Sequence, residues 1–439
     1  MRDRGLKLRI IVCAIAGTVL AVLGLAEAQS STSDLDATDR VVVASTIYSL
    51  VQQYFAHWEG ASRSDIEAAY RDYVDHALRD KSRKDFDLAT LRFIARLRNG
   101  HTQFFDSALD GRPLKFRLLQ VENQWMVTNS QDSRLSPGTI VQTLNGISVE
   151  EFVRESAQYV AASNGRLART HVFSYGGLFP EKVPVGLQGG GVVVVDRAIP
   201  GDVQRGSLPQ VSQGRWLREG RVAYIQIPSF GMPAFERTAI ELVRQFASSP
   251  NLVVDVRGNG GGATPFQLIA ALMNRPRRAW QDSTPQRIAL FEAQGNPPLR
   301  VTRDFLPQAP SSDAYTGRVF LLVDRFCGSA CEDFVMPFKD NGRAVVVGET
   351  TQGSSGNPYR ANLGFGMSVT IGAVRYRFPD GTPFEGVGIA PDVAVERRRS
   401  DVVAGRDAVL ERVQELSDLA LSAPYTARIH PIAAEGRAR

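Results

Sequence analysis

The sequence predicts a mixed α/β protein of several domains, and three observations indicate this class. The chain has 439 residues, enough for about two or three domains of ~150 residues each. Apolar residues make up 43% and charged residues 22% of it, which is ordinary globular usage and excludes a fibrous or wholly disordered chain. Its second half alternates apolar strands with amphipathic helices, the pattern of a sheet covered on both faces.

The first 28 residues have the pattern of a secretory signal peptide. Basic residues precede an apolar run from residue 10 to residue 25, and Ala26 and Ala28 supply the small residues that a signal peptidase reads. An uncleaved membrane anchor is the alternative, but the run is shorter than the ~20 residues that span a bilayer. We therefore expect cleavage after Ala28 and a periplasmic or secreted protein without stable membrane insertion.

Charge and cysteine content exclude two further classes. Lys plus Arg number 51 and Asp plus Glu 46, and without the first 28 residues the counts are 47 and 44. So small and evenly spread an excess does not favour nucleic-acid binding. Three cysteines are too few for a disulfide scaffold or a cysteine-rich metal site. Cys327 and Cys331, at the spacing of a helix start, would pair only with distorted geometry, so two buried free thiols are expected.

Three segments before the α/β part differ in pattern. Residues 29–43 are polar and are expected to form a flexible lead-in. Residues 44–112 repeat apolar side chains at spacings of three and four, which predicts a helical N-terminal domain. Residues 113–165 alternate apolar and polar side chains around an Asn145-Gly146 turn, which predicts a small β-rich module.

Residues 166–398 contain the alternation that predicts the α/β core. Continuous apolar strands are expected at 222–227, 252–256, 319–323 and 344–347, with helices at 234–247, 265–273 and 331–339. Two further strands are expected, at 192–195 and, antiparallel, at 367–374. Residues 399–439 are predicted to form a C-terminal helix, from 401 to 421, and a loosely ordered tail.

A glycine-rich segment follows the strand at 252–256. The run Asp255–Gly262 has four glycines in five positions, which frees the backbone to direct N–H groups at an anion. A nucleotide-binding P-loop would end in Gly-Lys-Ser/Thr, whereas this run ends in Ala263-Thr264. A tight turn would explain one or two of the glycines. The segment therefore predicts a cradle for an anion or an oxyanion.

Three other segments carry reactive side chains. Ser329 follows the strand at 319–323, where its Oγ would be exposed and the N–H of Ala330 would be free to stabilise an oxyanion. Taken alone, Ser329 could equally be a helix N-cap. His101 follows a predicted helix, and a single histidine is more often structural. Glu385 lies in a turn-rich segment and would alone be taken as a solvated acid.

Together and in this order, these segments resemble the C-terminal (tail-specific) processing serine peptidases and their relatives, the tricorn core protease and the retinoid-binding modules of the eye. The resemblance covers residues 45–415. It is carried by Tyr224-Ile225, Asp255–Gly262, Gly328-Ser329-Ala330, Gly348-Glu349-Thr350-Thr351, and Glu385-Gly386-Val387-Gly388 with Pro391-Asp392. It implies a ClpP/crotonase-like peptidase core, with a reduced PDZ-like module at 113–165.

The resemblance implies which residues act as nucleophile, oxyanion donors and general base. Ser329 falls on the nucleophile, and the N–H groups of Gly261 and Ala330 fall on the oxyanion hole. The processing-peptidase branch carries a lysine base where this chain has Ser354, and a serine cannot take that role. The tricorn-like branch uses a histidine, which His101 matches.

The acid partner implied by the tricorn-like branch is Glu385. In the tricorn enzyme a serine just before the histidine links it to the acid, and Gly100 stands at that position here. Thr102, a water or Glu385 itself could then orient His101.

The resemblance implies an exported serine endopeptidase or carboxy-terminal processing peptidase that acts on peptides or unfolded proteins, without a metal or organic cofactor. A non-catalytic ligand- or peptide-binding protein on the same fold is the alternative, because the retinoid-binding relatives hold ligands. An esterase would use the same residues. Neither pattern nor resemblance predicts the cleavage preference or the oligomeric state.

Overall fold

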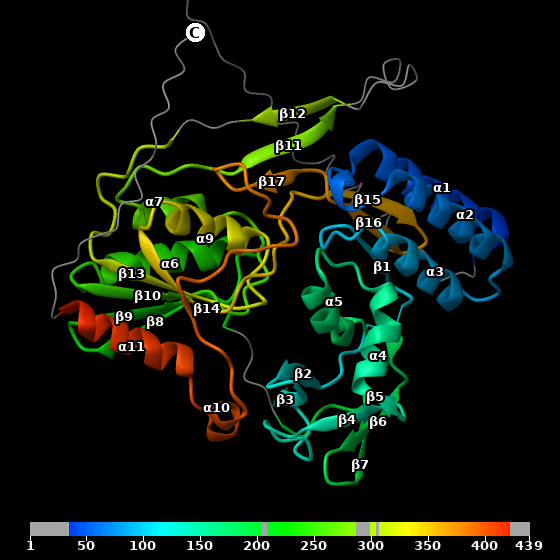
Figure 1. Cartoon of the computed structure of the whole chain (residues 1–439), viewed down its shortest axis with the longest axis horizontal. Helices are drawn as coiled ribbons and strands as arrows, with labels where there is room; N and C mark the ends of the chain where they lie inside the picture. The colour runs from blue at the N-terminus through cyan, green and yellow to red at the C-terminus, as the bar shows by residue number, and fades with distance from the viewer. Residues whose placement is uncertain (1–34, 110, 204–208, 287–298, 304–306, 422–439) are drawn as a thin grey trace, which may run out of the picture.

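The computed structural model describes residues 35–109, 111–203, 209–286, 299–303 and 307–421. The predicted signal peptide at 1–28 and the tail after residue 421 lie outside these residues. Three parts are visible in Figure 1: an α/β core, a layer of N-terminal helices, and a β-rich module below that layer. The mixed α/β class predicted from the sequence is confirmed.

The core is built on a six-stranded sheet in the order β18-β14-β13-β10-β9-β8. All neighbouring pairs are parallel except β8 with β9. The strands are β8 (Gln213–Arg218), β9 (Val222–Gln226), β10 (Asn251–Asp255), β13 (Arg318–Val323), β14 (Ala344–Gly348) and β18 (Val393–Ala394). The four predicted core strands are therefore confirmed, because continuous apolar runs of this length require burial on both faces.

Helices cover both faces of this sheet, as Figure 1 shows. One face packs against α6 (Pro233–Gln245), α7 (Phe266–Leu272) and α9 (Ala330–Asp340). The other face packs against α11 (Ala408–Leu421) through Val413 and its neighbours. The C-terminal helix predicted at 401–421 is interrupted: α10 (Arg399–Ala404) ends at Gly405, whose φ of 64° stops it.

The carboxyl ends of β10, β13 and β14 meet at one edge of the sheet. The register pairs Asp255 with Leu322 and Leu322 with Val347, so the strands end side by side. The glycine-rich loop follows β10, the turn with Ser329 follows β13, and the Gly348–Thr351 segment follows β14. Parallel strands thus bring together three motifs that are far apart in the sequence.

The N-terminal layer contains α1 (Ala37–Tyr54), α2 (Arg63–Arg79) and α3 (Arg83–Ala95). Helix α1 begins inside the predicted flexible lead-in at 29–43, because Asp36 caps it by accepting a hydrogen bond from the Asp39 N–H. The lead-in prediction is therefore wrong from residue 37 onward.

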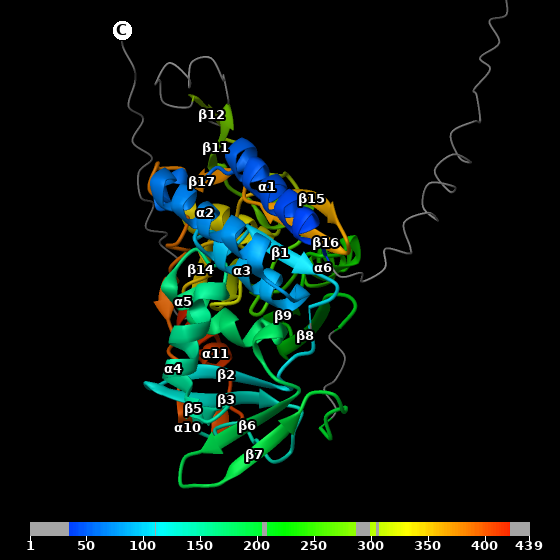
Figure 2. The ribbon, with the colours of Figure 1, turned by 90° about the vertical axis from the view of Figure 1, so that its right-hand side faces the viewer.

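A hairpin from the C-terminal half completes this helical layer. Strands β15 (Tyr359–Gly364) and β16 (Met367–Ile371) join β1 (Gln103–Asp106) in a sheet of order β1-β16-β15. The side chains of Met367, Val369 and Ile371 are buried in the same core as the helices. The antiparallel strand predicted at 367–374 thus exists, but it belongs to the N-terminal layer, and Figure 2 shows it beside α1.

The β-rich module extends past its predicted end at residue 165. Strand β6 (Lys182–Leu187) pairs with β4 (Val141–Leu144) and with β7 (Val192–Asp196), and all three share one core with α4 (Val149–Ser156) and α5 (Gly165–His171). The remaining strands are β2 (Phe116–Val121), β3 (Gln124–Ser130) and β5 (Ile147–Ser148). The strand predicted at 192–195 is confirmed, but as part of this module rather than of the core.

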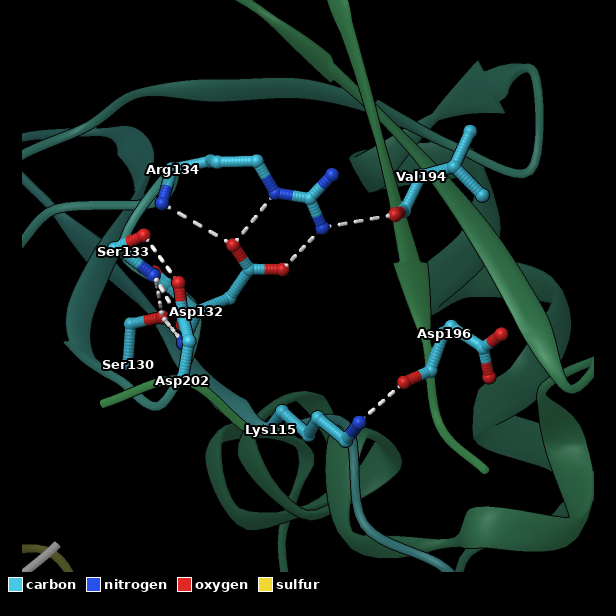
Figure 3. Close-up of polar contacts among 8 residues, drawn as sticks. All are labelled: Lys115, Ser130, Asp132, Ser133, Arg134, Val194, Asp196 and Asp202. Carbon is cyan, nitrogen blue, oxygen red and sulfur yellow. Dashed lines mark hydrogen bonds and ion pairs between the residues drawn. The ribbon is translucent and has the colours of Figure 1, made fainter. Parts of the chain in front are cut away.

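Polar side chains of the module bond to the main chain of its edge strand β7 (Figure 3). Arg134 donates to both carboxylate oxygens of Asp132, at 2.8 and 2.6 Å, and to the carbonyl of Val194 at 3.1 Å. Lys115 donates to the carbonyl of Asp196. Because Val194 lies on the edge strand β7, Arg134 covers part of an edge that would otherwise be open to strand addition.

A further sheet contains β12 (Leu299–Arg303), β11 (Gln281–Gln286) and β17 (Arg375–Arg377) in that order. Short 3-10 turns lie at Trp58–Gly60, Ala157–Tyr159, Val172–Ser174 and Gly176–Leu178. Among the described helices, none combines the length and the apolar character that a membrane crossing requires.

Candidate active site

The turn that carries Ser329 links β13 to α9. Ser329 occupies the N-cap position with φ 54° and ψ −125°, a conformation that residues other than glycine seldom adopt. Its side chain makes no capping hydrogen bond. Ser329 is therefore not an ordinary N-cap, and its hydroxyl stays available. Backbone strain of this kind collects at functional sites.

Both predicted oxyanion donors lie at this turn. Ala330 is the first residue of α9, and its N–H has no acceptor within the described residues. A Cβ atom on Gly261 would lie 2.7 Å from Ser329 Cβ and 2.9 Å from Ala330 N, so only glycine fits. The Gly261 N–H, however, donates to Asn259 Oδ1 at 2.9 Å. One donor is thus free and the other is engaged.

Cys327 and Cys331 form a disulfide across the same turn, so the prediction of two free thiols is wrong. The prediction placed both cysteines on a helix start, but the helix begins at Ala330. The positive φ of Ser329 folds the chain back and brings the two Cα atoms to 5.5 Å, within the usual range of disulfides.

His101 lies just before β1, and its main chain is fixed on both sides. Its N–H donates to Asn99 Oδ1 at 3.1 Å, and its carbonyl accepts from Thr370 Oγ1 at 2.9 Å. Nδ1 of the ring lies 2.9 Å from Ser354 Oγ. When Nδ1–H donates to this hydroxyl, the lone pair is on Nε2. Burial lowers the pKa of His101 to about 4, so the ring is neutral at neutral pH.

Ser354 connects the His101 ring to the turn of Ser329. Its carbonyl accepts from the Ser329 N–H at 2.9 Å, while its Oγ bonds the imidazole. Its own N–H donates to Glu332 Oε2 at 3.1 Å. The position that carries lysine in the processing-peptidase branch thus holds a residue that orients the histidine.

Glu332 fixes the segment from Thr351 to Ser354. It is fully buried and accepts from Thr351 Oγ1 at 2.5 Å and from the Gly353 N–H at 2.7 Å, besides Ser354. Burial raises the pKa of Glu332 to about 8 although these donors act in the opposite direction.

Gly100 leaves room for the Ser354 hydroxyl. A Cβ atom on Gly100 would lie 2.7 Å from Ser354 Oγ and 3.3 Å from Ser163 Oγ, so a serine there would displace the hydroxyl that bonds His101. Ser163 supplies the missing hydroxyl from another segment: it accepts from the Gly100 N–H at 2.9 Å and donates to Glu385 Oε1 at 2.5 Å.

Glu385 is enclosed by the segment that carries His101. Its Oε1 also accepts from Asn99 Nδ2 at 2.7 Å. Its Oε2 is buried without a hydrogen-bond partner among the described residues, and the Ser355 N–H lies near the carboxyl group. Burial raises the pKa of Glu385 to about 7. The interpretation of this residue as a solvated acid is therefore wrong.

The predicted residues form one connected cluster, although not by the predicted contacts. Within the described residues, neither Ser329 nor Glu385 makes a direct hydrogen bond to the His101 ring. Thr102, which was expected as one possible partner, instead bonds Asn99 Oδ1 at 2.9 Å. Ser354 and Ser163 take the orienting positions. The two departures from the family pattern, at 100 and 354, were the only sequence signal of this exchange.

Comparison with known proteins agrees with this geometry. Residues 221–395 match the model of peptidase family S41. The chain carries a peptidase family S41 domain. This domain holds Ser329, Ser354, Glu385 and the glycine-rich loop, whereas His101 and Ser163 come from outside it.

Curated relatives of the S41 domain are peptidases. The tricorn protease of Thermoplasma acidophilum is 29% identical over 194 residues, which are 43% of this chain and 16% of that protein. The chloroplastic C-terminal processing peptidase of Tetradesmus obliquus is 26% identical over 179 residues, 40% of this chain and 35% of that protein. The matched region is thus well under two thirds of either relative's length.

Among solved structures, that of mature CPAF complexed with lactacystin has a TM-score of 0.70 and 14% identity, covering 88% of this chain and 98% of that chain. At this identity the likeness shows the fold. It extends beyond the S41 domain to the N-terminal layer and the β-rich module, and the predicted peptidase fold is therefore confirmed.

Proposed function

We propose that this chain is a serine peptidase that cleaves peptides or unfolded proteins through an acyl-enzyme on Ser329. The observation that carries the proposal is the double contact of Ser354, which accepts from the Ser329 N–H and bonds the His101 ring. This contact links the segment of a nucleophile to a neutral base, although the two come from distant parts of the chain.

His101 acts as the general base. With Nδ1–H donated to Ser354, Nε2 accepts the Ser329 proton as Oγ attacks a substrate carbonyl, and later gives it to the leaving amine. Direct hydrogen bonds between such groups often form only when substrate is bound, so their absence here does not oppose the role. Water then hydrolyses the acyl-enzyme by the same steps.

The oxyanion is stabilised by the Ala330 and Gly261 N–H groups. Ala330 points from the start of a helix, where the dipole also favours negative charge. Gly261 shares its N–H between Asn259 and the oxyanion, because a charged oxygen is a stronger acceptor than a neutral amide oxygen. Each such donor is worth roughly 3 kcal/mol in the transition state.

Glu385 positions the base from a distance. Its contacts to Asn99 and Ser163 hold the segment that carries His101.

The test uses an unstructured peptide and a fluorophosphonate probe. We expect hydrolysis by the wild type and its loss, by at least about a thousandfold, in Ser329→Ala and His101→Ala. The probe should label the wild type at Ser329. Full hydrolysis by both variants would contradict the assignment, and a folded wild type that neither cleaves nor is labelled would favour a ligand-binding protein.

We also propose that the protein is exported, with cleavage after Ala28. The signal-peptide pattern supports this, and so does the disulfide, because disulfides persist in oxidising compartments. The mass and N-terminal sequence of the protein from a periplasmic or secreted fraction test it. A product that retains residues 1–28 would contradict the proposal.

A further inference from the structure

The disulfide lies around the nucleophile itself. Cys327 is two residues before Ser329 and Cys331 is two residues after it, and both side chains are fully buried. Cys327 follows β13, whereas Cys331 belongs to the first turn of α9. The S–S bond therefore joins the two arms of the turn that aims both Ser329 Oγ and the Ala330 N–H.

Hydrogen bonds from other segments hold the first arm of this turn and Ser329. The Gln352 N–H donates to the Cys327 carbonyl at 2.9 Å, and the Gly328 N–H donates to the Asn259 carbonyl at 3.2 Å. The Ser329 N–H is held by Ser354.

The second arm is held by side-chain bonds that begin only after Cys331, where the Glu332 carboxylate accepts from Thr351, Gly353 and Ser354. The N–H groups of Cys331 and Glu332 donate to the carbonyls of Gly328 and Ser329, which lie within the turn. Between Ser329 and Glu332, the disulfide adds a covalent cross-link from the start of α9 to the arm that the neighbouring loops hold.

The backbone conformation of Ser329 depends on the groups that hold the turn, and the disulfide is one of them. A serine at φ 54° is strained, so the turn keeps this shape only while its surroundings impose it. Without the S–S bond, the segment between Cys327 and Cys331 can relax toward an ordinary N-cap geometry, in which the serine hydroxyl bonds the helix instead of a substrate.

We propose that the Cys327–Cys331 disulfide is a positioning pair for the nucleophile and the oxyanion donor, so that the oxidised chain is the efficient enzyme. The inference rests on the peptidase function proposed above. Reduction by a dithiol breaks the S–S bond and leaves two thiols, while the dithiol becomes a cyclic disulfide. Because both sulfur atoms are buried, reduction requires the turn to open, and the bond resists reductant in the folded state.

The experiment compares one chain in two redox states. Wild type is unfolded in urea, reduced with dithiothreitol and refolded with or without the reductant. We expect kcat of the reduced form to be lower by about 10- to 100-fold, because misplacement of a reacting group by ~1 Å costs this much. KM should change less than about twofold, since the proposed role of the bond concerns the reacting groups rather than substrate binding. Reoxidation should restore kcat.

A matched variant separates the bond from the reagent. Cys327→Ala/Cys331→Ala should show the lower kcat under both conditions and respond to neither reductant nor oxidant. The rate of fluorophosphonate labelling at Ser329 should follow kcat in every sample.

Each outcome decides the proposal. A reduced, folded chain with the kcat of the oxidised chain would overturn it, and so would a reduced chain that fails to fold by circular dichroism, since the bond would then serve folding alone. An oxidised wild type without hydrolysis or labelling would refute the peptidase function, and this inference with it. An active oxidised enzyme that is indifferent to reduction would refute this inference only.

Discussion

Ser354 shows how a single residue can replace a catalytic group by an orienting one. Its N–H, carbonyl and hydroxyl contact Glu332, Ser329 and His101 respectively. The carbonyl and N–H contacts need no particular side chain, because they belong to the backbone. The hydroxyl contact does, since it selects the tautomer of His101.

Removal of this hydroxyl should impair turnover more than binding. For Ser354→Ala we expect kcat to fall by about 10- to 100-fold with KM nearly unchanged, because the imidazole loses its orienting bond. Steady-state kinetics on a peptide measures both parameters. Ser354→Thr, which keeps a hydroxyl, should recover part of the loss.

Ser355→Ala is the matched control for this prediction. Ser355 is the next residue and is also buried, but its Oγ bonds Asp333 at 3.2 Å rather than the histidine. Equal losses of kcat in the two variants would show that any change in this segment disturbs the site and would contradict the orienting role of Ser354.

The pH dependence of activity distinguishes His101 from Glu385. Burial lowers the pKa of His101 to about 4 and raises that of Glu385 to about 7. Because only His101 exchanges the proton with Ser329, we expect kcat/KM to stay high below pH 6.5 and to fall only as His101 becomes protonated. Glu385→Gln, which keeps the hydrogen bonds to Asn99 and Ser163, should leave this acid limb in place. A limb near pH 7 that disappears in Glu385→Gln would contradict the assignment.

At the scale of elements, the start of α5 connects the β-rich module to the site. Asn164 donates to the carbonyls of Gln352 and Gly386 at 3.0 and 3.1 Å. Arg166 donates to the carbonyls of Thr350 and Thr351 at 2.8 and 2.6 Å. With Ser163, these residues fix both the loop that holds Ser354 and the segment that holds Glu385.

Loss of the Arg166 contacts should cost both stability and turnover. For Arg166→Ala we expect the free energy of unfolding to fall by about 1–3 kcal/mol, because two carbonyls lose charged donors. The kcat should fall as well, since the Thr350–Ser354 loop is no longer pinned. Urea unfolding and peptide kinetics measure the two effects.

Arg169→Ala is the control on the same helix. Arg169 pairs with Glu150 at the surface, a contact worth about 1 kcal/mol or less. Its removal should leave kcat unchanged. A larger loss in Arg169→Ala than in Arg166→Ala would show that α5 acts only through its general packing.

The sequence predicts the elements of the core better than it predicts their partners. Apolar runs such as 252–256 reveal a buried strand by themselves, because burial on both faces leaves a local pattern. The pairing of β16 with β1, or of β6 with β4, depends on contacts between distant residues that leave no such pattern. The strands at 192–195 and 367–374 were therefore expected in approximately the right places but assigned to the core, and β1 and β6 were not predicted.

For the candidate site too, features with a local sequence pattern were predicted, and features that depend on distant contacts were not. Ser329, His101 and Glu385 were predicted from short motifs that are ambiguous singly and informative in their order, and the structure brings the three residues into one cluster. Ser163 was missed because it stands 62 residues beyond His101 with no motif around it. The disulfide was misjudged because a spacing of four residues suggests a helix, whereas the backbone reversal at Ser329 is a tertiary property.

For the molecule as a whole, buried carboxyl groups set the response of stability to pH. Burial raises the pKa of Glu332 to about 8 and that of Glu385 to about 7, and burial beside Asp106 raises the pKa of Asp87. These groups ionise near pH ~4 in an unfolded chain. The folded state therefore binds more protons above this pH, and stability falls as the pH rises through their folded pKa values.

Two histidines act in the opposite direction, but only at lower pH. Burial lowers the pKa of His101 and His171 to about 4, from 6.5. Their contribution to stability increases from pH 4 to pH 6.5 and is complete above that range. Between pH 6.5 and about 8 the carboxyl groups act alone, and we expect the urea midpoint to decrease over this range and to level off above it. Glu332→Gln should flatten the decrease, whereas a midpoint that rises with pH would contradict the expectation.

The hairpin that carries Met367, Val369 and Ile371 ties the order of synthesis to the appearance of activity. These residues fill the core of the first helices, yet they are made some three hundred residues after them. A nascent chain that leaves the ribosome, or threads through a secretion channel, cannot finish its amino-terminal layer before residue 371 has emerged. The layer that carries His101 is thus completed only after Ser329 has been made. A truncated translation product that ends before residue 371 lacks this layer, and we expect it to be inactive.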